Sequence, residues 1–288
     1  MRTDQETDSG GAFAPPAAAT RQGLSLVPLY AAMIALAILS AVFILFSDLD
    51  LRFAALFHDP ATGFPASRDP WLGLLRRIGK EVIVLSSVIL LASLALKLFR
   101  PSKALPIAAS RIWFLLASLA IGPGLIVNGI LKSAWGRPRP IQVDLFGGSA
   151  PFETAWKISG ACRGNCSFVS GEAASAIWLL GLIVLAPPRY RPALAVAIGL
   201  LVLALSLNRI AFGGHFLSDV LISWAITLVV MLSLHRVMVA GPFSVWLDTA
   251  TESALRRIAL ALAPALGRIA KRRPSDRRNG LGELDQPN

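Results

Sequence analysis

Charged residues are scarce in this chain, and their scarcity argues against an ordinary soluble protein. Asp, Glu, Lys and Arg make up 16% of the 288 residues, whereas 55% are hydrophobic. A soluble domain carries charge on about a quarter of its residues. The composition therefore indicates a protein that exposes much of its surface to lipid.

Cysteine and histidine are also rare. The two cysteines, Cys162 and Cys166, form a Cys-x3-Cys pair with no histidine and no further cysteine beside it. A structural zinc site needs about four such ligands, so the sequence argues against a zinc centre. The pair is read either as two free thiols or as a disulfide that braces its loop, provided that the loop lies outside the cytoplasm. We predict the disulfide.

Long apolar runs take the place of the missing charge, and each is close to the roughly 20 residues that cross a bilayer. The runs cover residues 24–46, 82–99, 112–131, 168–186, 193–208 and 216–234. We therefore predict an all-α fold, a bundle of six transmembrane helices that forms one domain over residues 24–238. The first run is longer than the core of a signal peptide and follows a long polar tail, so we expect it to be retained.

The predicted domain carries a tail at each end. Residues 1–23 are poor in bulky apolar side chains and are predicted to be disordered. Residues 239–288 are basic, and the stretch from Glu252 to Arg273 has the pattern of an amphipathic helix that lies on a membrane surface. Pro264 would divide this helix into two short pieces, and the residues from Pro274 are predicted to be disordered.

Positive charge predicts both the orientation and the partners of the chain. Lys and Arg are more numerous in the segments that face inward if the N-terminus is cytoplasmic, as the positive-inside rule requires. Arg76, Arg77 and Lys80 on the outer side weaken this bias. We predict a multi-pass protein of the inner (plasma) membrane with both termini in the cytoplasm. The net charge of +11 is then explained by anionic membrane lipids, not by nucleic acid.

Three polar clusters lie at the ends of these apolar runs. They are the segment 132–140, the segment 170–172, and Arg209 with His215 and Asp219. With six spans, counting alone places all three on one side of the membrane, the outer or periplasmic face. If one span were miscounted, the third cluster would lie across the membrane from the other two.

Each cluster suits the binding or transfer of an anionic group. Lys132, Arg139 and Arg209 are cations at a bilayer boundary, where unpaired charge is costly. Ser170 and Gly171 begin a helix, whose free N–H groups favour an anion. Taken singly, these features are also typical of topological anchors and of an ordinary helix cap. Their conjunction favours a phosphate site.

The third cluster adds a nucleophile. His215 and Asp219 are spaced i, i+4, so on a helix the carboxylate can reach one ring nitrogen, fix the tautomer and leave the other nitrogen free. Such a pair is more often structural when it occurs alone. Beside three cations it predicts attack on phosphorus.

The clusters resemble the motifs of the type 2 phosphatidic acid phosphatase/vanadium haloperoxidase family. The family's Lys, six residues, Arg-Pro motif is matched by Lys132 to Arg139-Pro140. Its Pro-Ser-Gly-His motif is matched only at Ser170 and Gly171. Its Ser-Arg, five residues, His, three residues, Asp motif is matched from Arg209 to Asp219, with Asn208 in place of serine. The resemblance covers about residues 80–235.

The resemblance implies a role for each matching residue. Phosphate would be bound by Lys132, Arg139, Ser170, Gly171 and Arg209, and Arg137 is a further candidate for phosphate contact. His215 would be the nucleophile that forms a phosphohistidine, and Asp219 would orient it. Catalysis of this kind needs neither a metal nor another cofactor, because the cations stabilise the transferred group.

Glu172 stands where the family has a histidine that protonates the leaving alcohol. A carboxylic acid can donate a proton there only if its surroundings keep it protonated. Two outcomes are open: Glu172 is the general acid of a variant site, or it pairs with Arg137 or Lys132 and leaves a slow or inactive enzyme. We favour the active variant.

The leading hypothesis is a membrane phosphatase that hydrolyses a lipid phosphomonoester or diphosphate. Lipid A, undecaprenyl diphosphate, phosphatidylglycerol phosphate and phosphatidic acid are the candidate substrates. A protein that only binds or transports phospholipids, and a lipid phosphotransferase, are the alternatives.

Overall fold

The computed structural model describes residues 25–271, and this part of the chain is helical, with two isolated bridges and no strand. The predicted all-α class is confirmed. The main helices are α1 (Val27–Leu45), α2 (Asp48–Ala55), α3 (Pro70–Phe99), α4 (Ala109–Leu119) with its continuations η2 (Ala120–Leu131) and α5 (Lys132–Ala134), α6 (Gly171–Trp178) with η5 (Leu179–Leu185), α7 (Arg191–Ala211), α8 (Leu217–His235) with η7 (Arg236–Ala240), and α9 (Phe243–Lys271). Short 3₁₀ turns, η1 (Pro65–Arg68), η3 (Pro140–Gln142), η4 (Asp144–Phe146) and η6 (Pro188–Tyr190), lie in the connections.

Within residues 25–271, five helical segments are long and apolar enough to cross a membrane. They are Val27–Leu45, Pro70–Phe99, Ala109–Ala134, Pro188–Ala211 and Leu217–Ala240. The sixth predicted span is a shorter apolar helix, Gly171–Leu185. Its second half is 3₁₀-helical and rises about 2.0 Å per residue, against about 1.5 Å in an α-helix. The count of six spans therefore stays a prediction.

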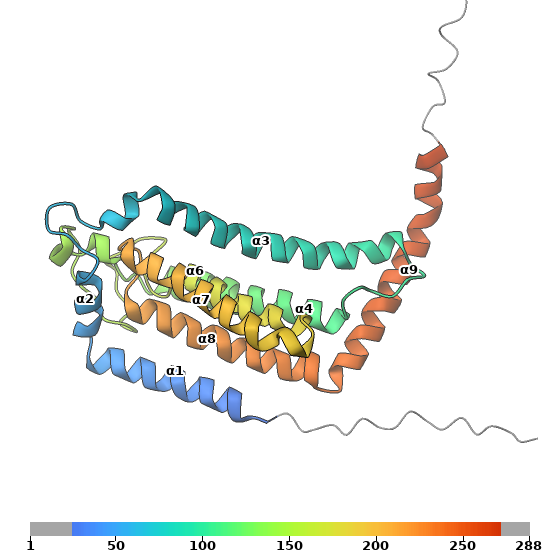
Figure 1. Ribbon diagram of the computed structural model, residues 1–288, viewed down its shortest axis with the longest axis horizontal. Helices are drawn as coiled ribbons and strands as arrows, with labels where there is room; N and C mark the ends of the chain where they lie inside the picture. Colours follow the sequence, from blue (N-terminus) through green and yellow to red (C-terminus); the bar gives the residue numbers. More distant parts are fainter. Residues whose placement is uncertain (1–24, 272–288) are drawn as a thin grey trace, which may run out of the picture.

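The helices lie along one another and reverse direction at their ends (Figure 1). α3 forms one edge of the bundle and α1 the opposite edge, with α4, α6, α7 and α8 between them. The loops that follow α5 and α7 lie at one end, beside α2, and α9 crosses the other end. The three polar clusters are therefore gathered at a single end of the bundle.

Polar caps fix where the helices around that end begin. The Asp69 side chain accepts hydrogen bonds from the backbone N–H groups of Trp71 and Leu72 at the start of α3, and Pro70 occupies the first turn. α3 thus begins well before Val82, where its apolar run starts. Arg76, Arg77 and Lys80 are consequently helical residues, not loop residues.

Trp178 of α6 forms hydrogen bonds to α4 in the interior of the bundle. Its ring is fully buried, and Nε1 donates to the Leu115 carbonyl at 2.9 Å and to Ser118 Oγ at 3.1 Å. Burying a tryptophan requires such a partner for its N–H group. These bonds fasten α6 to α4 and so set the position of the helix that begins at Ser170.

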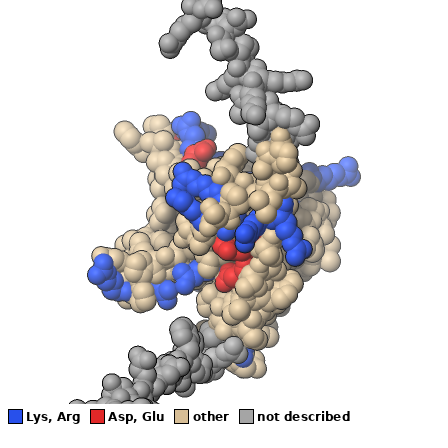
Figure 2. Space-filling model, turned by 90° about the vertical axis from the view of Figure 1, so that its right-hand side faces the viewer, with Lys and Arg blue, Asp and Glu red and all other residues tan. Residues whose placement is uncertain are grey.

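α9 closes the end of the bundle opposite the polar clusters. Asp248 accepts a hydrogen bond from the Ser110 backbone N–H at the start of α4, and Glu252 lies 3.5 Å from the buried Lys97 ammonium. Figure 2 shows this end, where Lys and Arg side chains gather with a few acidic side chains between them. The expectation that Pro264 divides the helix is wrong, because α9 runs through it as one helix.

The predicted disordered tails, residues 1–23 and those from Pro274, lie outside the described residues.

Candidate active site

The structure brings the three polar clusters together around His215. The imidazole is almost completely buried in the loop between α7 and α8. Burial, and then the positive charges of Arg209, Lys132 and Arg139, lower the pKa of His215 well below its ordinary value of 6.5. The ring is therefore neutral at neutral pH, and the three cations that lower its pKa converge on it from separate segments.

A backbone carbonyl orients this ring. His215 Nδ1 lies 2.8 Å from the Ser167 carbonyl oxygen, so in the neutral ring Nδ1–H donates to that carbonyl. The other nitrogen, Nε2, then carries no proton and has a free lone pair. Sequence reasoning missed Ser167, because no residue type marks a carbonyl that faces a ring.

Asp219 does not make the direct hydrogen bond that its i, i+4 spacing predicts. Its Oδ2 is 3.9 Å from His215 Nδ1, beyond hydrogen-bond distance. Instead Oδ2 accepts from Ser167 Oγ at 2.5 Å and from the Phe216 backbone N–H at 2.8 Å. Ser167 thus bridges the two residues, since its hydroxyl holds Asp219 and its carbonyl holds His215.

Arg137 does not reach the phosphate site, and its assignment as a phosphate contact is wrong. The guanidinium is fully buried and donates to the carboxylates of Asp219 and Asp50 at 2.7 and 2.8 Å. Its remaining bonds go to Ser218 Oγ and to the Glu153 carbonyl. Burial alone would lower the pKa of Arg137, but the charges of Asp219 and Asp50 outweigh it and raise the pKa.

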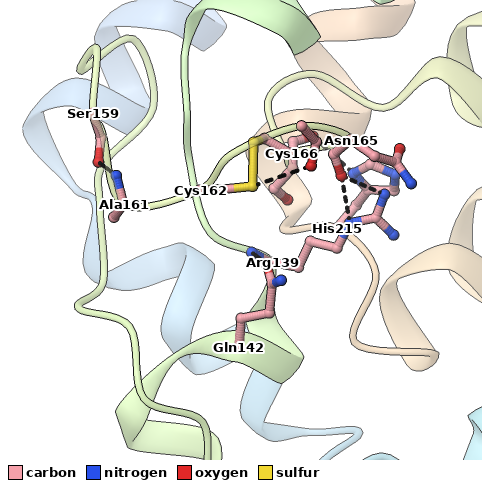
Figure 3. Close-up of a disulfide and its surroundings, with 10 residues drawn as sticks. Arg139, Gln142, Ser159, Ala161, Cys162, Asn165, Cys166 and His215 are labelled. Carbon is pink, nitrogen blue, oxygen red and sulfur yellow. Dashed lines mark hydrogen bonds between the residues drawn. A yellow bond between two sulfur atoms is a disulfide. The ribbon is translucent and has the colours of Figure 1, made fainter.

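Arg139 is held by the loop that contains the disulfide (Figure 3). Its Nε and Nη2 donate to the Asn165 carbonyl at 3.0 and 2.8 Å. Cys162 and Cys166 are joined in a disulfide, so the cross-link closes the short loop that presents Asn165. Arg139 thereby lies beside His215 with part of its guanidinium free.

Ser170 and Gly171 begin α6 as predicted from the second cluster. Ser170 Oγ accepts from the Ala173 backbone N–H at 3.3 Å, and the Ser170 N–H donates to the Asp219 carbonyl at 3.0 Å. A side chain at Gly171 would collide with Asn128, because a Cβ there would lie 2.3 Å from Asn128 Oδ1. The glycine lets η2 approach the start of α6.

Arg209 is almost buried at the end of α7. A Cβ on Gly214 would lie 2.4 Å from Arg209 Nη2, so the glycine leaves room for the guanidinium. Arg209 Nε is 3.2 Å from Glu172 Oε2.

Glu172 pairs with different cations from those expected. It contacts neither Arg137 nor Lys132, and instead Arg76 donates from Nε to Oε2 at 2.9 Å and from Nη2 to Oε1 at 2.5 Å. Lys80 lies 3.7 Å from Oε1. Sequence analysis missed Arg76 and Lys80 as site residues, although their i, i+4 spacing near one end of an apolar helix places them on one face.

A cavity of about 360 Å³ lies beside these groups. Its polar lining includes Arg76, Lys80, Lys132 and Glu172, and its apolar lining includes Ile83, Val84 and Leu205. Within residues 25–271, no three His, Cys, Asp or Glu side chains are grouped so that they could hold a metal ion. The absence of a metal requirement stays a prediction.

The family model and the relatives that match this chain all point to one family of phosphatases. The PAP2 superfamily model matches residues 111–242. The chain is 47% identical over 126 residues to a lipid A 4'-phosphatase of Rhizobium leguminosarum (44% of this chain, 54% of the relative). It is 49% identical over 119 residues to that of Rhizobium etli (41% and 46%). A lipid A 4'-phosphatase of Francisella tularensis subsp. novicida is 36% identical over 180 residues (62% and 81%). The chain thus spans about half the length of the two Rhizobium relatives. No solved structure gives a significant match.

Proposed function

This chain belongs to the PAP2 superfamily, and on that premise we propose that it is a membrane phosphatase that removes the 4'-phosphate of lipid A or of a closely related glycolipid. The names of the three relatives support this substrate over the other lipid phosphates considered. The observation that carries the proposal is the buried His215 ring, which is oriented by the Ser167 carbonyl and faced by the charges of Arg209, Lys132 and Arg139.

The cavity beside the site supports a lipid substrate. Its cationic part, at Arg76, Lys80 and Lys132, suits a phosphate, and its apolar part, at Ile83, Val84 and Leu205, suits a hydrocarbon chain. Arg supplies a planar fork for phosphate oxygens and Lys a point charge. One cavity can therefore hold the two chemically unlike ends of one molecule.

The proposed reaction has two steps. Nε2 of His215 attacks phosphorus, an N–P bond forms, and the P–O bond to the sugar breaks with its electron pair on the sugar oxygen, which takes up a proton. Water then attacks the phosphohistidine and the N–P bond breaks. Inorganic phosphate and neutral His215 are left, and the proton that water gives up balances the one taken by the alcohol.

The surrounding groups serve both steps. Lys132, Arg139, Arg209 and the N–H group of Gly171 stabilise the charge on the transferred phosphoryl group. The Ser167 carbonyl keeps the proton of His215 on Nδ1, and Asp219 acts through Ser167 as a positioning residue. All of these residues are supplied by the chain itself.

We also propose that the protein lies in the inner membrane with both termini in the cytoplasm and the site at the outer face. The gathering of the three clusters at one end of the bundle and of α9 at the other supports this topology (Figure 1). Lys and Arg at the α9 end agree with an inner surface that faces anionic lipid.

The test is phosphate release from a panel of lipid phosphates by the purified full chain in detergent, with EDTA present. His215→Ala is the active-site variant, and His235→Ala at the far end of α8 is the matched control. We expect release from lipid A that survives EDTA, disappears in His215→Ala and persists in His235→Ala. Release that EDTA abolishes, or that His215→Ala retains, would contradict the proposed mechanism. A wild-type protein that binds lipid A without releasing phosphate would support the binding alternative.

A further inference from the structure

Glu172 connects two helices that are far apart in the sequence. Both of its carboxylate oxygens accept hydrogen bonds from Arg76 of α3, and Oε2 also lies 3.2 Å from Arg209 Nε of α7. A carboxylate engaged in this way accepts hydrogen bonds and has no proton to donate. The geometry is that of a bracket between two guanidinium groups.

The α3 side of this bracket lies outside the region that the family model matches, residues 111–242. Arg76 and Lys80 nevertheless line the same cavity as Lys132 and Gly171. The Arg76 and Lys80 side chains are 36% and 53% exposed, so both can contact a bound group. Lys80 is only loosely held, at 3.7 Å from Glu172.

From this arrangement we infer that Arg76 and Lys80 belong to the phosphate-binding set and that Glu172 is a positioning residue, not the proton donor. The inference rests on the proposed phosphatase function. Five cations, Arg76, Lys80, Lys132, Arg139 and Arg209, surround the site and repel one another. Glu172 is the carboxylate that holds two of them, Arg76 and Arg209, in fixed positions before phosphate binds.

The source of the leaving-group proton separates this role from general acid catalysis. If Glu172 only positions cations, the sugar oxygen takes its proton from water. Loss of Glu172 then slows phosphoryl transfer regardless of the leaving group. If Glu172 were the general acid, its loss would slow the hydrolysis of esters of ordinary alcohols. It would not slow the hydrolysis of an ester whose leaving group needs no proton.

The experiment compares lipid A with 4-nitrophenyl phosphate, whose nitrophenolate leaves without a proton. The variants are Glu172→Gln, Arg76→Gln, Lys80→Gln and the double variant Glu172→Gln/Arg76→Gln. Arg77→Gln is the matched control, because Arg77 is the neighbour of Arg76 on α3. Arg77 does not line the cavity, and within residues 25–271 it forms no salt bridge. The midpoint of thermal unfolding confirms that each variant is folded.

We expect Glu172→Gln and Arg76→Gln to lower kcat/KM for both substrates by the same factor, about 10- to 100-fold. The double variant should be little worse than either single variant, because the two residues act as a unit. Lys80→Gln should raise KM, and Arg77→Gln should match the wild type. A Glu172→Gln enzyme that loses activity on lipid A and keeps it on 4-nitrophenyl phosphate would overturn the inference. Arg76→Gln and Lys80→Gln enzymes that behave like Arg77→Gln would overturn it as well.

Binding of inorganic phosphate separates this inference from the proposed function. The dissociation constant, measured by calorimetry on the full chain in detergent, should rise about tenfold or more in Arg76→Gln and Lys80→Gln and stay unchanged in Arg77→Gln. If the four proteins bind phosphate with these relative affinities but the wild type hydrolyses no ester, the proposed phosphatase function is wrong, and the assignment of Arg76 and Lys80 to the phosphate-binding set is retained. Equal phosphate affinity in all four proteins would remove Arg76 and Lys80 from the binding set even if the wild type is an active phosphatase.

Discussion

The guanidinium of Arg137 and the carboxylate of Asp219 form a fully buried ion pair, with 2.7 Å between Nη1 and Oδ1. A second buried carboxylate, Asp50 of α2, lies 2.8 Å from Nη2 of the same arginine. Asp50 also accepts hydrogen bonds from the backbone N–H and hydroxyl of Ser218. The network therefore joins α2, which lies outside the family-matched region, to the first turn of α8. In that turn Asp219 follows Ser218 and accepts the hydrogen bond of the Ser167 hydroxyl, and the Ser167 carbonyl orients His215.

Replacing Arg137 should destabilise the protein severely. Arg137→Met would leave two carboxylates buried without a cation, which costs about 3–5 kcal/mol. We expect a large fall in the midpoint of thermal unfolding in detergent and loss of activity. Arg52→Gln is the control on the same side of the molecule, because its pair with Asp48 is highly exposed and such pairs contribute about 1 kcal/mol or less. Equal midpoints for the two variants would contradict a structural role for Arg137.

The pH dependence of activity should report the lowered pKa of His215. Attack on phosphorus needs the neutral ring, so the acid limb of kcat/KM should lie below pH 6.5, the ordinary histidine value. Arg139 is one of the cations that lower this pKa. Arg139→Gln should therefore raise the pKa and move the acid limb to higher pH.

The substrate's own phosphate titrates equally in both proteins, so the difference between the wild-type and Arg139→Gln profiles isolates the histidine. Profiles of kcat/KM against pH, measured with one substrate at constant ionic strength, supply the comparison. A limb that stays in place, or moves to lower pH, would show that Arg139 does not act on the titrating group.

The membrane pattern and the motifs were predictable because each rests on one continuous stretch of sequence. The apolar runs predicted the helical class. Because Lys132, Ser170 and His215 lie at the ends of such runs, counting the runs predicted that they share one end of the bundle. The start of α3 was not predictable from hydropathy, because the charges from Arg76 to Glu81 interrupt the apolar run while a cap at Asp69 and Pro70 starts the helix earlier.

The pairing of side chains within the site could not be read from the sequence. Whether Glu172 meets Arg76, Arg137 or Lys132 depends on how α3 and α6 are rotated toward each other, which spacing within one segment does not fix. The contact between His215 and Ser167 depends on the path of the 141–170 loop. Ser167 carries no motif signal, and its carbonyl rather than its side chain holds the ring.

Breaking the disulfide should weaken substrate binding more than it weakens chemistry. In the variant with both Cys162→Ser and Cys166→Ser, the loop is free to move and the Asn165 carbonyl no longer holds Arg139 in one place. We expect KM to rise by about tenfold, with a smaller change in kcat, and a loss of about 2 kcal/mol of stability for so short a loop. Reducing agent should reproduce the effect in the wild type and do nothing to the double variant. A double variant with wild-type KM would show that Arg139 keeps its position without the cross-link.

Gly214→Ala should impair the site by displacing Arg209. The added Cβ would lie 2.4 Å from Arg209 Nη2, so the guanidinium must move away from both Glu172 and the phosphate position. Removing one fixed donor of this kind costs about 100-fold in rate, and we expect kcat/KM to fall by about that factor while the protein remains folded. Gly199→Ala in α7, the helix that carries Arg209, is the matched control, because a Cβ at Gly199 would meet open space. This substitution should stabilise the protein by about 1 kcal/mol or less. Measured with lipid A as substrate, equal kcat/KM for the two variants would mean that the observed position of Arg209 is not the one that phosphate release requires.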